Sequence, residues 1–382
     1  MSAVPVSATA GVRQAARRLD QSGVRVFQLG AGEPQTPSPA EVVAAAGRAA
    51  ADPRLHRYAP GQGIPDLRDA VADYRADLYG HALSPDAVLV TCGAKQAVFN
   101  TLLALVDPGD EVIVPTPCWV SYPTMAQLAG GVPVAVPTTA EEGFTPRVQQ
   151  LEAARTPRTK VLVLNSPGNP TGAVYPADEL RRIGRWALTH GIWVISDEVY
   201  GELLEKGSEP LSVVTAVPEL SEQCAVVHGV SKTFAMTGWR VGWLIGPARL
   251  IKAATALQSH STSHPTAVAQ QAAAAALTDA RDAAERMRAD YQRRRQLVVE
   301  RLSGVPGVTL AAPRGAFYAF PRFAPGGRPL DDEEFATRLL REHHVATVPG
   351  AAFGAPSHLR ISCTADDDEL LEGLDRLLRA LP

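Results

Sequence analysis

Short runs of apolar and often β-branched residues recur through the middle of the chain and indicate its architecture. Several runs are apolar at nearly every position, which is typical of strands buried on both faces of a sheet. Between many of them lie helix-like stretches, such as residues 95–106 and 177–190. This alternation predicts a mostly parallel sheet with helices on both faces. The expected strands are residues 88–91, 111–114, 132–136, 161–164, 192–196, 225–230 and 241–245.

The pattern changes near residue 266. Residues 266–302 are rich in Ala, Arg, Gln and Leu and contain almost no Gly or Pro, so we expect long helices there. The tail holds a candidate strand at residues 316–320 and candidate helices at residues 331–342 and 366–381. This mixture predicts a second, smaller α+β domain.

The predicted fold is therefore α/β. We expect a large domain with a mostly parallel seven-stranded sheet flanked by helices, over residues 37–285, and a small α+β domain over residues 286–382. Residues 1–36 match neither pattern. We predict that they form an arm that also contributes to the small domain.

The composition favours a soluble globular protein, with 46% hydrophobic and 20% charged residues. The net charge of −3 gives no electrostatic signature of nucleic-acid or membrane binding. The four cysteines form no close cluster with histidines, so we predict no metal site and no disulfide framework. The N-terminus lacks the apolar core of a signal peptide and no apolar run reaches membrane-spanning length, so we expect a cytoplasmic protein.

The most informative stretch is G-V-S-K-T-F-A-M-T-G-W-R-V-G-W, residues 229–243. Lys232 lies just after an expected buried strand, and Arg240 follows eight residues later. A lysine amine can form an imine when burial and nearby positive charge lower its pKa. Taken alone, a lysine at a strand end more often extends to solvent, so other motifs must decide between the two interpretations.

Three further motifs follow expected strands. They are N-S-P-G-N-P-T-G (residues 165–172), S-D-E-V-Y (residues 196–200) and T-C-G-A-K-Q (residues 91–96). Asp197 lies beside an apolar run, where its charge needs a cationic partner such as a protonated pyridine nitrogen. The third motif leads into a helix N-terminus, whose backbone N–H groups favour a phosphate. Open α/β sheets bind ligands at the carboxyl ends of their strands, where all four motifs lie.

Together these motifs resemble the class I aminotransferases of the fold-type-I pyridoxal-phosphate superfamily. Within this class the chain is most similar to the bacterial aspartate and prephenate aminotransferase subgroup. The resemblance covers nearly the whole chain, and the order of the motifs is highly specific. The other motifs that carry it are A-G-E-P at 31–34, R-Y-A-P-G-Q-G at 57–63, D-P-G-D-E-V at 107–112, W-V-S-Y-P at 119–123 and L-R-I-S at 359–362.

The resemblance implies a pyridoxal-phosphate-dependent aminotransferase that works by ping-pong transfer between an amino acid and a 2-oxo acid. Lys232 would carry pyridoxal 5'-phosphate as a Schiff base and act as the base for the proton shift. Asp197 would pair with the pyridine N–H. Asn169 and Tyr200 would hydrogen-bond the phenolic oxygen of the ring, and Trp119 would stack on the ring face. Lys232, Asp197 and Tyr200 form the implied catalytic set.

The resemblance also implies how the phosphate is held. Gly93, Ala94, Ser231 and Arg240 would bind it, and Tyr58 would reach it from a second subunit. A homodimer with shared active sites is therefore expected.

A dicarboxylic substrate, such as aspartate or glutamate and possibly prephenate, is the expected specificity. Arg360 would bind the α-carboxylate as a bidentate fork, and the backbone of Gly32 would approach the same group. Lys95 would bind the distal carboxylate with Thr9; the alternative for Lys95 is added charge near the phosphate. The implied substrate-binding residues are Thr9, Gly32, Lys95, Trp119, Asn169 and Arg360.

The chain departs from its relatives at a few positions. Gly229 stands where relatives often have Ser, which would remove one phosphate hydroxyl, and Cys118 and Cys363 also replace other residues. Two alternative functions stay open: another pyridoxal-phosphate reaction on the same scaffold, such as a β-lyase, and a non-enzymatic ligand-sensing domain. The second alternative lacks a visible regulatory partner segment.

Overall fold

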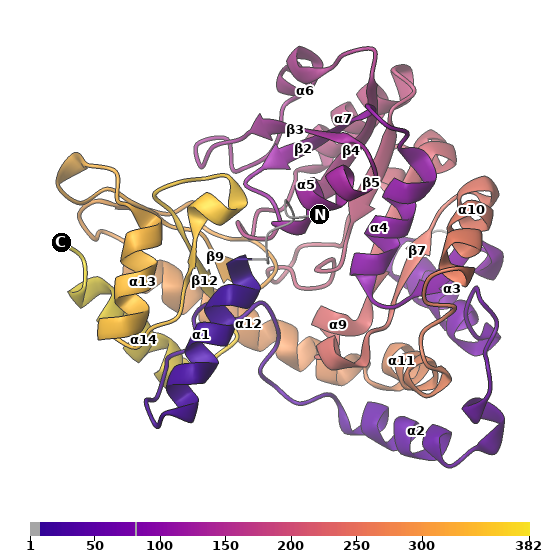
Figure 1. Cartoon of the computed structure of the whole chain (residues 1–382), viewed down its shortest axis with the longest axis horizontal. Helices are drawn as coiled ribbons and strands as arrows, with labels where there is room; N and C mark the ends of the chain where they lie inside the picture. The colour runs from indigo at the N-terminus through magenta and orange to yellow at the C-terminus, as the bar shows by residue number, and fades with distance from the viewer. Residues whose placement is uncertain (1–7, 81) are drawn as a thin grey trace.

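The computed structural model of the protein describes residues 8–80 and 82–382. Its centre is a seven-stranded sheet of order β1-β7-β6-β5-β4-β2-β3 (Figure 1). Strands β2 to β6 are parallel to one another, whereas β7 is antiparallel to both β1 and β6. The strands are Val88–Thr91 (β1), Glu111–Thr116 (β2), Val132–Pro137 (β3), Thr159–Asn165 (β4), Trp193–Asp197 (β5), Cys224–Gly229 (β6) and Gly242–Ile245 (β7).

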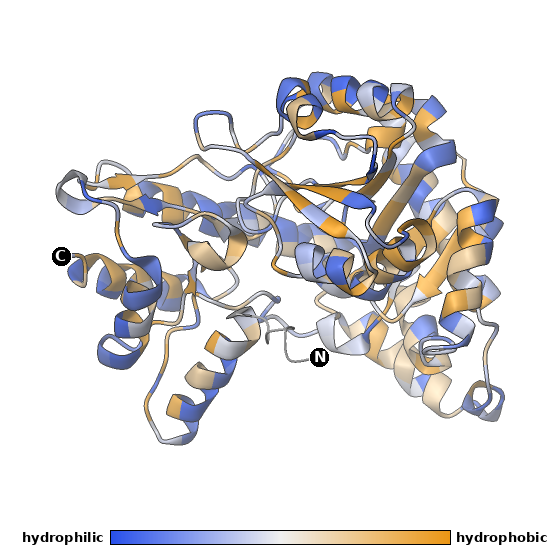
Figure 2. Cartoon of the chain, turned by 45° about the horizontal axis from the view of Figure 1, so that its top comes forward, coloured by the Kyte–Doolittle hydropathy of each residue, from blue (hydrophilic) through white to orange (hydrophobic). Residues whose placement is uncertain are grey.

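Helices cover both faces of this sheet, as the sequence predicted. Because side chains alternate along each strand, the two faces have separate cores; Val88 and Val90 point into one, and Leu89 into the other. One core is completed by α2 (Ala40–Ala50), α3 (Pro65–Tyr79), α6 (Val148–Ala154), α7 (Ala177–Thr189), α8 (Val213–Ala216) and α11 (Ala267–Asp279). The other is completed by α4 (Ala94–Leu105), α5 (Ser121–Leu128) and α10 (Ala248–Ser259). The strands are mainly apolar and lie between helices whose outer sides are polar (Figure 2).

The C-terminal part of the chain has its own apolar core, drawn in yellow and orange in Figure 1. It contains a three-stranded antiparallel sheet of order β11-β12-β9 and a two-stranded sheet of β8 and β10. Its strands are Val308–Thr309 (β8), Tyr318–Ala319 (β9), Arg322–Phe323 (β10), Val348–Pro349 (β11) and Leu359–Ser362 (β12). Its helices are α12 (Arg281–Leu302), α13 (Asp332–Glu342) and α14 (Asp367–Arg379).

The N-terminal segment forms α1 (Ala8–Gln21), and Figure 1 shows it beside α12 and the C-terminal part. Val12 and Ala16 of α1 pack with Val26, Leu340 and Ala346. These contacts attach the helix to the C-terminal part. The expected domain boundaries at residues 36/37 and 285/286 stay a prediction.

The predicted fold class is confirmed, and all seven predicted sheet strands are present with ends that shift by at most two residues. The strand expected over residues 316–320 is shorter, because only Tyr318–Ala319 pairs. Ala316 has a φ of 54°, which interrupts the extended backbone before β9. Within residues 8–80 and 82–382, no helix combines the length and apolar composition needed to cross a membrane.

Candidate active site

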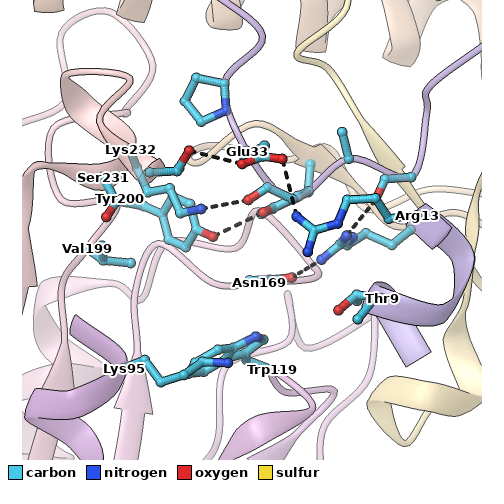
Figure 3. A pocket seen from close by; sticks show the side chains of 18 of the residues that line it. Thr9, Arg13, Glu33, Lys95, Trp119, Asn169, Val199, Tyr200, Ser231 and Lys232 are labelled. Carbon is cyan, nitrogen blue, oxygen red and sulfur yellow. Dashed lines mark hydrogen bonds and ion pairs between the residues drawn. The ribbon is translucent and has the colours of Figure 1, made fainter. Parts of the chain in front are cut away.

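A cavity of about 910 Å³ lies at the carboxyl ends of the parallel strands (Figure 3). Side chains from the central sheet, from α1 and from the C-terminal part line it together. The sequence-predicted site residues meet here, with two exceptions, Tyr58 and Gly93. Those that line the cavity are Thr9, Gly32, Ala94, Lys95, Trp119, Asn169, Asp197, Tyr200, Ser231, Lys232, Arg240 and Arg360.

Lys232 lies on a short helix, α9 (Val230–Thr233), that directly follows strand β6. Its Nζ donates a hydrogen bond of 2.6 Å to the backbone carbonyl of Gly32. Burial of the amine lowers the pKa of Lys232 to about 8, and the positive charges of Arg360 and Arg240 act in the same direction. The lowered pKa increases the neutral fraction of the amine near neutral pH, and a lysine needs its neutral form to act as a nucleophile or base.

Asp197 ends strand β5 and is 4% exposed. Its carboxylate accepts hydrogen bonds from the hydroxyl of Tyr122 at 2.7 Å and from the backbone N–H of Val199 at 3.2 Å. Burial raises the pKa of Asp197 to about 6, although these two hydrogen bonds oppose the shift. Among the described residues the carboxylate forms no ion pair, so a cationic ligand atom in the cavity would stabilise it.

The N-terminus of α4 forms an anion-binding cradle with Arg240. Gly93 caps this helix with a φ of 80°, and a Cβ built on it would overlap the Arg240 guanidinium. Arg240 also donates to the carbonyls of Thr237 at 2.7 Å and Cys92 at 3.3 Å. Glycine is thus required for the backbone and the cation to meet, and the N-terminus of a helix beside a guanidinium favours an anion.

Arg360 lies on β12 and is 1% exposed. It donates a hydrogen bond of 3.0 Å to the side-chain oxygen of Asn169 and one of 2.9 Å to the carbonyl of Gly30. Its Nε has no hydrogen-bond partner within the described chain, and no carboxylate pairs with its charge there. Gly32 lies next to the guanidinium, where a Cβ would be 3.5 Å from Nη2. A buried guanidinium with only neutral acceptors favours binding of a carboxylate ligand.

Two aromatic hydroxyls and one amide complete the inner wall. Tyr200 is buried, its hydroxyl lies 3.1 Å from that of Tyr318, and burial raises its pKa well above the usual value. Asn169 is fixed through its backbone N–H, which donates 2.9 Å to Asn165 Oδ1. Both residues face the cavity beside Lys232 (Figure 3).

Lys95 and Trp119 lie together at another side of the cavity (Figure 3). Lys95 Nζ is 4.9 Å from the centroid of the Trp119 ring, a cation–π contact. Partial burial and the charge of Arg240 lower the pKa of Lys95. Thr9, in the first turn of α1, also lines the cavity.

Tyr58 does not line this cavity. Its side chain is 92% exposed, and its ring packs edge-on against His264 at 5.9 Å. A role for Tyr58 in the site of another copy of the chain is consistent with this exposure and stays a prediction.

Sequence reasoning missed several residues of the site. Arg13 of α1 lines the cavity and forms an ion pair with Glu33 at 3.3 Å, and Thr237 donates 2.9 Å to the same carboxylate. Tyr122, the donor to Asp197, lies within the quoted motif W-V-S-Y-P but had no assigned role. Its position three residues after Trp119, on the same side of a helix start, is the signal that could have identified it.

The departure at Gly229 has a packing explanation, whereas nothing in the structure explains those at Cys118 and Cys363. A Cβ at Gly229 would lie 2.8 Å from the Cα of Gly242, so the close approach of β6 and β7 leaves no room for Ser. Cys118 and Cys363 are buried, and burial raises the pKa of each thiol to about 12. Neither cysteine lines the main cavity. In the described part of the chain no group of three or more potential ligands could hold a metal ion.

Comparisons with known proteins identify the family of the chain. The sequence model of the family described as "Aminotransferase class I and II" matches residues 24–377. An aspartate aminotransferase of Streptomyces avermitilis is 47% identical, over 100% of this chain and 95% of that protein. An aspartate/prephenate aminotransferase of Thermus thermophilus is 43% identical, over 100% of this chain and 97% of that protein. The solved structure of a Thermus thermophilus aspartate aminotransferase with maleate has a TM-score of 0.94 at 43% identity, over 100% of this chain and 98% of that chain.

Proposed function

Because the chain belongs to the class I and II aminotransferase family, we propose that this pyridoxal-phosphate-dependent enzyme exchanges amino groups between dicarboxylic amino acids and 2-oxo acids. Aspartate and glutamate are the proposed amino donors. Prephenate, a 2-oxo acid with a second carboxylate, is a candidate amino acceptor, in line with the name of the Thermus relative. The related Thermus structure with maleate, a dicarboxylate, supports the same substrate class.

One observation carries this proposal: the cavity presents separate cations to two carboxylates. Arg360 is buried without a carboxylate partner in the described chain, and Lys95 lies at a different side of the cavity, where it forms no ion pair with any described residue. A buried carboxylate without a cationic partner is energetically costly, so a dicarboxylic substrate needs both of these cations. We therefore assign the α-carboxylate to Arg360 and the distal carboxylate to Lys95, with Thr9 nearby.

The cavity also fits the cofactor. Asp197 is a buried carboxylate that needs a cationic partner, and the cradle of Gly93 and Arg240 suits a phosphate. Ala94 and Ser231 would bind the phosphate with them, Asn169 and Tyr200 would bind the phenolic oxygen, and Trp119 would cover the ring. When bound, pyridoxal phosphate supplies an aldehyde that takes up the amino group and a ring that accepts electrons as the substrate Cα–H bond breaks.

The chain's own groups would orient the substrate and move its proton. Arg360 would fix the α-carboxylate, and Gly32, whose carbonyl accepts a hydrogen bond of 2.6 Å from Lys232 Nζ, lies next to both groups. Lys232 would then remove the proton from the substrate Cα and deliver it to the former aldehyde carbon of the cofactor, on the other side of the nitrogen. Asp197 would keep the ring nitrogen protonated, which requires its carboxylate to stay ionised.

We also propose a homodimer in the cytoplasm. Tyr58 is 92% exposed and outside the cavity of its own chain, as expected for a residue that completes a neighbouring site. The unpaired buried thiols, such as Cys118 and Cys363, suit a reducing compartment.

The substrate proposal is tested with Lys95→Ala and a panel of amino donors. If Lys95 binds the distal carboxylate, kcat/KM for aspartate and glutamate falls selectively, while that for alanine changes little. The expected loss is about 2–4 kcal/mol, or tens- to several-hundred-fold. Lys252→Ala, which removes an exposed lysine of α10 that does not line the cavity, is the matched control. An equal loss for all donors would instead assign Lys95 to the phosphate.

A further inference from the structure

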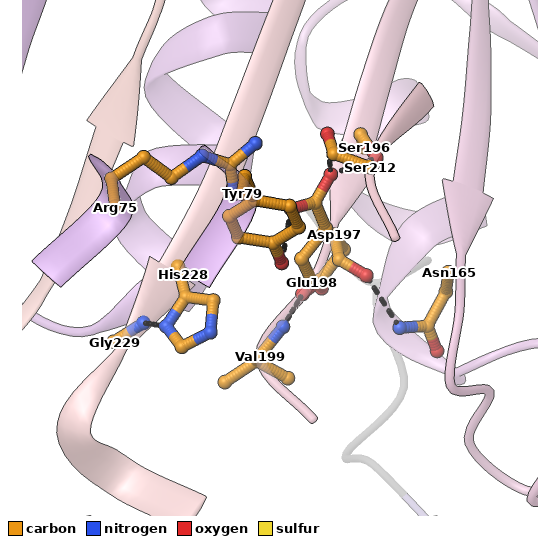
Figure 4. Close-up of polar contacts among 10 residues, drawn as sticks. All are labelled: Arg75, Tyr79, Asn165, Ser196, Asp197, Glu198, Val199, Ser212, His228 and Gly229. Atoms are coloured by element: carbon orange, nitrogen blue, oxygen red, sulfur yellow. Dashed lines mark hydrogen bonds and ion pairs between the residues drawn. The ribbon is translucent and has the colours of Figure 1, made fainter. Parts of the chain in front are cut away.

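A second buried carboxylate lies directly behind Asp197, on the opposite face of the sheet (Figure 4). Glu198 is 2% exposed, yet the proposed reaction gives it no role. Four side chains donate hydrogen bonds to its two oxygens, which is nearly the full capacity of a carboxylate. The donors are Arg75 Nη1 at 2.6 Å, Tyr79 Oη at 3.1 Å, Ser196 Oγ at 2.8 Å and Ser212 Oγ at 2.5 Å.

Strand alternation places the two carboxylates on opposite faces. Along β5, Val194 packs into the core beside α3 and α7, and Ile195 packs into the core beside α4 and α5. Asp197 follows Ile195 on the second face and bonds Tyr122 there. Glu198 turns back to the first face and meets Arg75, which lies on α3.

Hydrogen bonds of the backbone fix the turn that contains the two acids. The N–H of Glu198 donates 2.8 Å to the Val227 carbonyl on β6, and the N–H of Gly201 donates 2.7 Å to the Glu198 carbonyl. Between them, the N–H of Val199 donates to Asp197 itself. Anchoring the Glu198 side chain on α3 therefore also anchors the turn that holds Asp197.

Charge links the two acids as well. Asp197 faces Tyr122 on α5, Lys232 on α9 and, across the strand, Glu198, whose negative charge disfavours a second ionised carboxylate. Arg75 is the cation that pairs with Glu198 within residues 8–80 and 82–382. The nearby His228 does not supply positive charge, because burial lowers its pKa to about 4. Arg75 thus offsets the negative charge of Glu198, which disfavours ionisation of Asp197.

We propose that Arg75 is a positioning residue for the cofactor: through Glu198 it fixes the turn after β5 and cancels the charge behind Asp197, so that Asp197 stays ionised against the ring nitrogen. This inference rests on the proposed pairing of Asp197 with that nitrogen. A purely structural role for the Arg75–Glu198 pair is the alternative. The two roles predict different effects of substitution on protonation of the ring nitrogen. In a purely structural role, removing Arg75 or Glu198 has a similar effect, because both changes disturb the same packing. In the positioning role the effects have opposite signs, because the two changes alter the charge behind Asp197 in opposite directions.

The test uses the full-length enzyme loaded with pyridoxal phosphate that carries ¹⁵N at the ring nitrogen. Nuclear magnetic resonance of this label, at about pH 8, reports the ratio of protonated to neutral nitrogen independently of turnover. Arg75→Met leaves Glu198 uncompensated, and its charge favours transfer of the shared proton from the ring nitrogen to the nearer Asp197; we expect that ratio to fall about tenfold, the factor that corresponds to a change of one in pKa. Glu198→Gln leaves Arg75 uncompensated, so the ratio should stay equal or rise.

The double variant Arg75→Met with Glu198→Gln removes both charges and keeps the length of the Glu198 side chain. Its ratio should return to within about threefold of the wild type, since no net charge remains behind Asp197. If Arg75→Met does not fold, Glu198→Gln is compared with the double variant, and we expect a ratio at least as high in the single variant. A lower ratio in Glu198→Gln than in the double variant, or equal losses in both single variants, overturns the proposal.

The wild type and Asp197→Asn separate this inference from the site assignment. A protonated ring nitrogen in the wild type that is lost in Asp197→Asn supports the pairing on which the inference rests. If Asp197→Asn leaves the nitrogen protonated, the pairing itself is wrong, and with it the role of Arg75. If the pairing holds but the ratio of protonated to neutral nitrogen changes equally in Arg75→Met and Glu198→Gln, only the role of Arg75 is refuted.

Discussion

Burial brings the pKa values of two oppositely charged residues in the cavity towards neutrality. The pKa of Lys232 falls to about 8 and that of Asp197 rises to about 6, chiefly because water is excluded from both. Both residues could be proposed from the sequence because several motifs occur together in one order; a lysine at a strand end, taken alone, more often extends to solvent. Their tertiary contacts could not, since Tyr122 reaches Asp197 only through the packing of α5, and Arg75 reaches Glu198 only through the packing of α3.

In the cofactor-free protein, the ionised Asp197 should lower the free energy of unfolding, because its charge is buried without the cationic partner that the cofactor would provide. Its folded-state pKa of about 6 exceeds the ordinary 3.8, so the folded state binds more protons and stability falls as pH rises between these values. Asp197→Asn should therefore raise the free energy of unfolding by about 1–3 kcal/mol at pH 8, with no gain near pH 4. Urea denaturation at both pH values measures this difference. Asp178→Asn, on the exposed surface of α7, is the control, and a less stable Asp197→Asn at pH 8 contradicts the account.

The pKa of Lys232 sets the pH dependence of cofactor capture. Only the neutral amine can add to an aldehyde, so the rate at which cofactor-free protein binds pyridoxal phosphate covalently should rise with pH. The midpoint should lie near 8, more than two below the ordinary value of 10.5. Stopped-flow absorbance between about pH 6 and pH 10 measures it. A midpoint near 10 would show that the amine is not desolvated.

At the scale of elements, the site depends on close contact between the start of α4, strand β7 and Arg240. The strands next to these residues, β1 and β7, could be predicted well, because strands buried on both faces are apolar at almost every position. The strand at residues 316–320 was overestimated, because its composition does not reveal the positive φ of Ala316. Nor does composition reveal that α1 lines the cavity, since its residues contact elements more than 300 positions away.

Gly93→Ala tests the contact between α4 and Arg240. The φ of 80° at this residue suits glycine, and the added Cβ would overlap the guanidinium. We expect the affinity for pyridoxal phosphate to fall at least about tenfold, with a stability loss of about 1–3 kcal/mol. Gly80→Ala is the matched control, because Gly80 also has a positive φ of 71° but open space around its Cβ. Equal effects of both variants on cofactor affinity would mean that backbone strain alone explains the result.

At the scale of the whole molecule, the cavity joins distant parts of the chain. Lys232 and Asp197 come from the central sheet, Arg360 from the C-terminal part and Thr9 from α1. The order of motifs along the sequence predicted this set, but the arrangement that brings Arg360 to Asn169 required the structure. The family match over residues 24–377 and the full-length similarity to aspartate aminotransferases support the enzyme over the ligand-sensing alternative.

The exposure of Tyr58 leads to a prediction about assembly. If Tyr58 completes the phosphate site of a second copy, the protein sediments as a dimer, and Tyr58→Phe weakens pyridoxal-phosphate binding by about 1–2 kcal/mol without dissociating the dimer. Sedimentation at assay concentration and cofactor titration measure the two effects. A monomer with full activity would refute the shared site.

The central claim is that Lys232 holds pyridoxal phosphate, and reduction with borohydride tests it most directly. The wild-type protein, incubated with the cofactor, reduced and digested, should yield one peptide modified at Lys232, identified by tandem mass spectrometry. Lys232→Ala, treated in the same way, should yield no specific adduct. Labelling at Lys95 or another lysine, or no uptake of cofactor at all, would contradict the account.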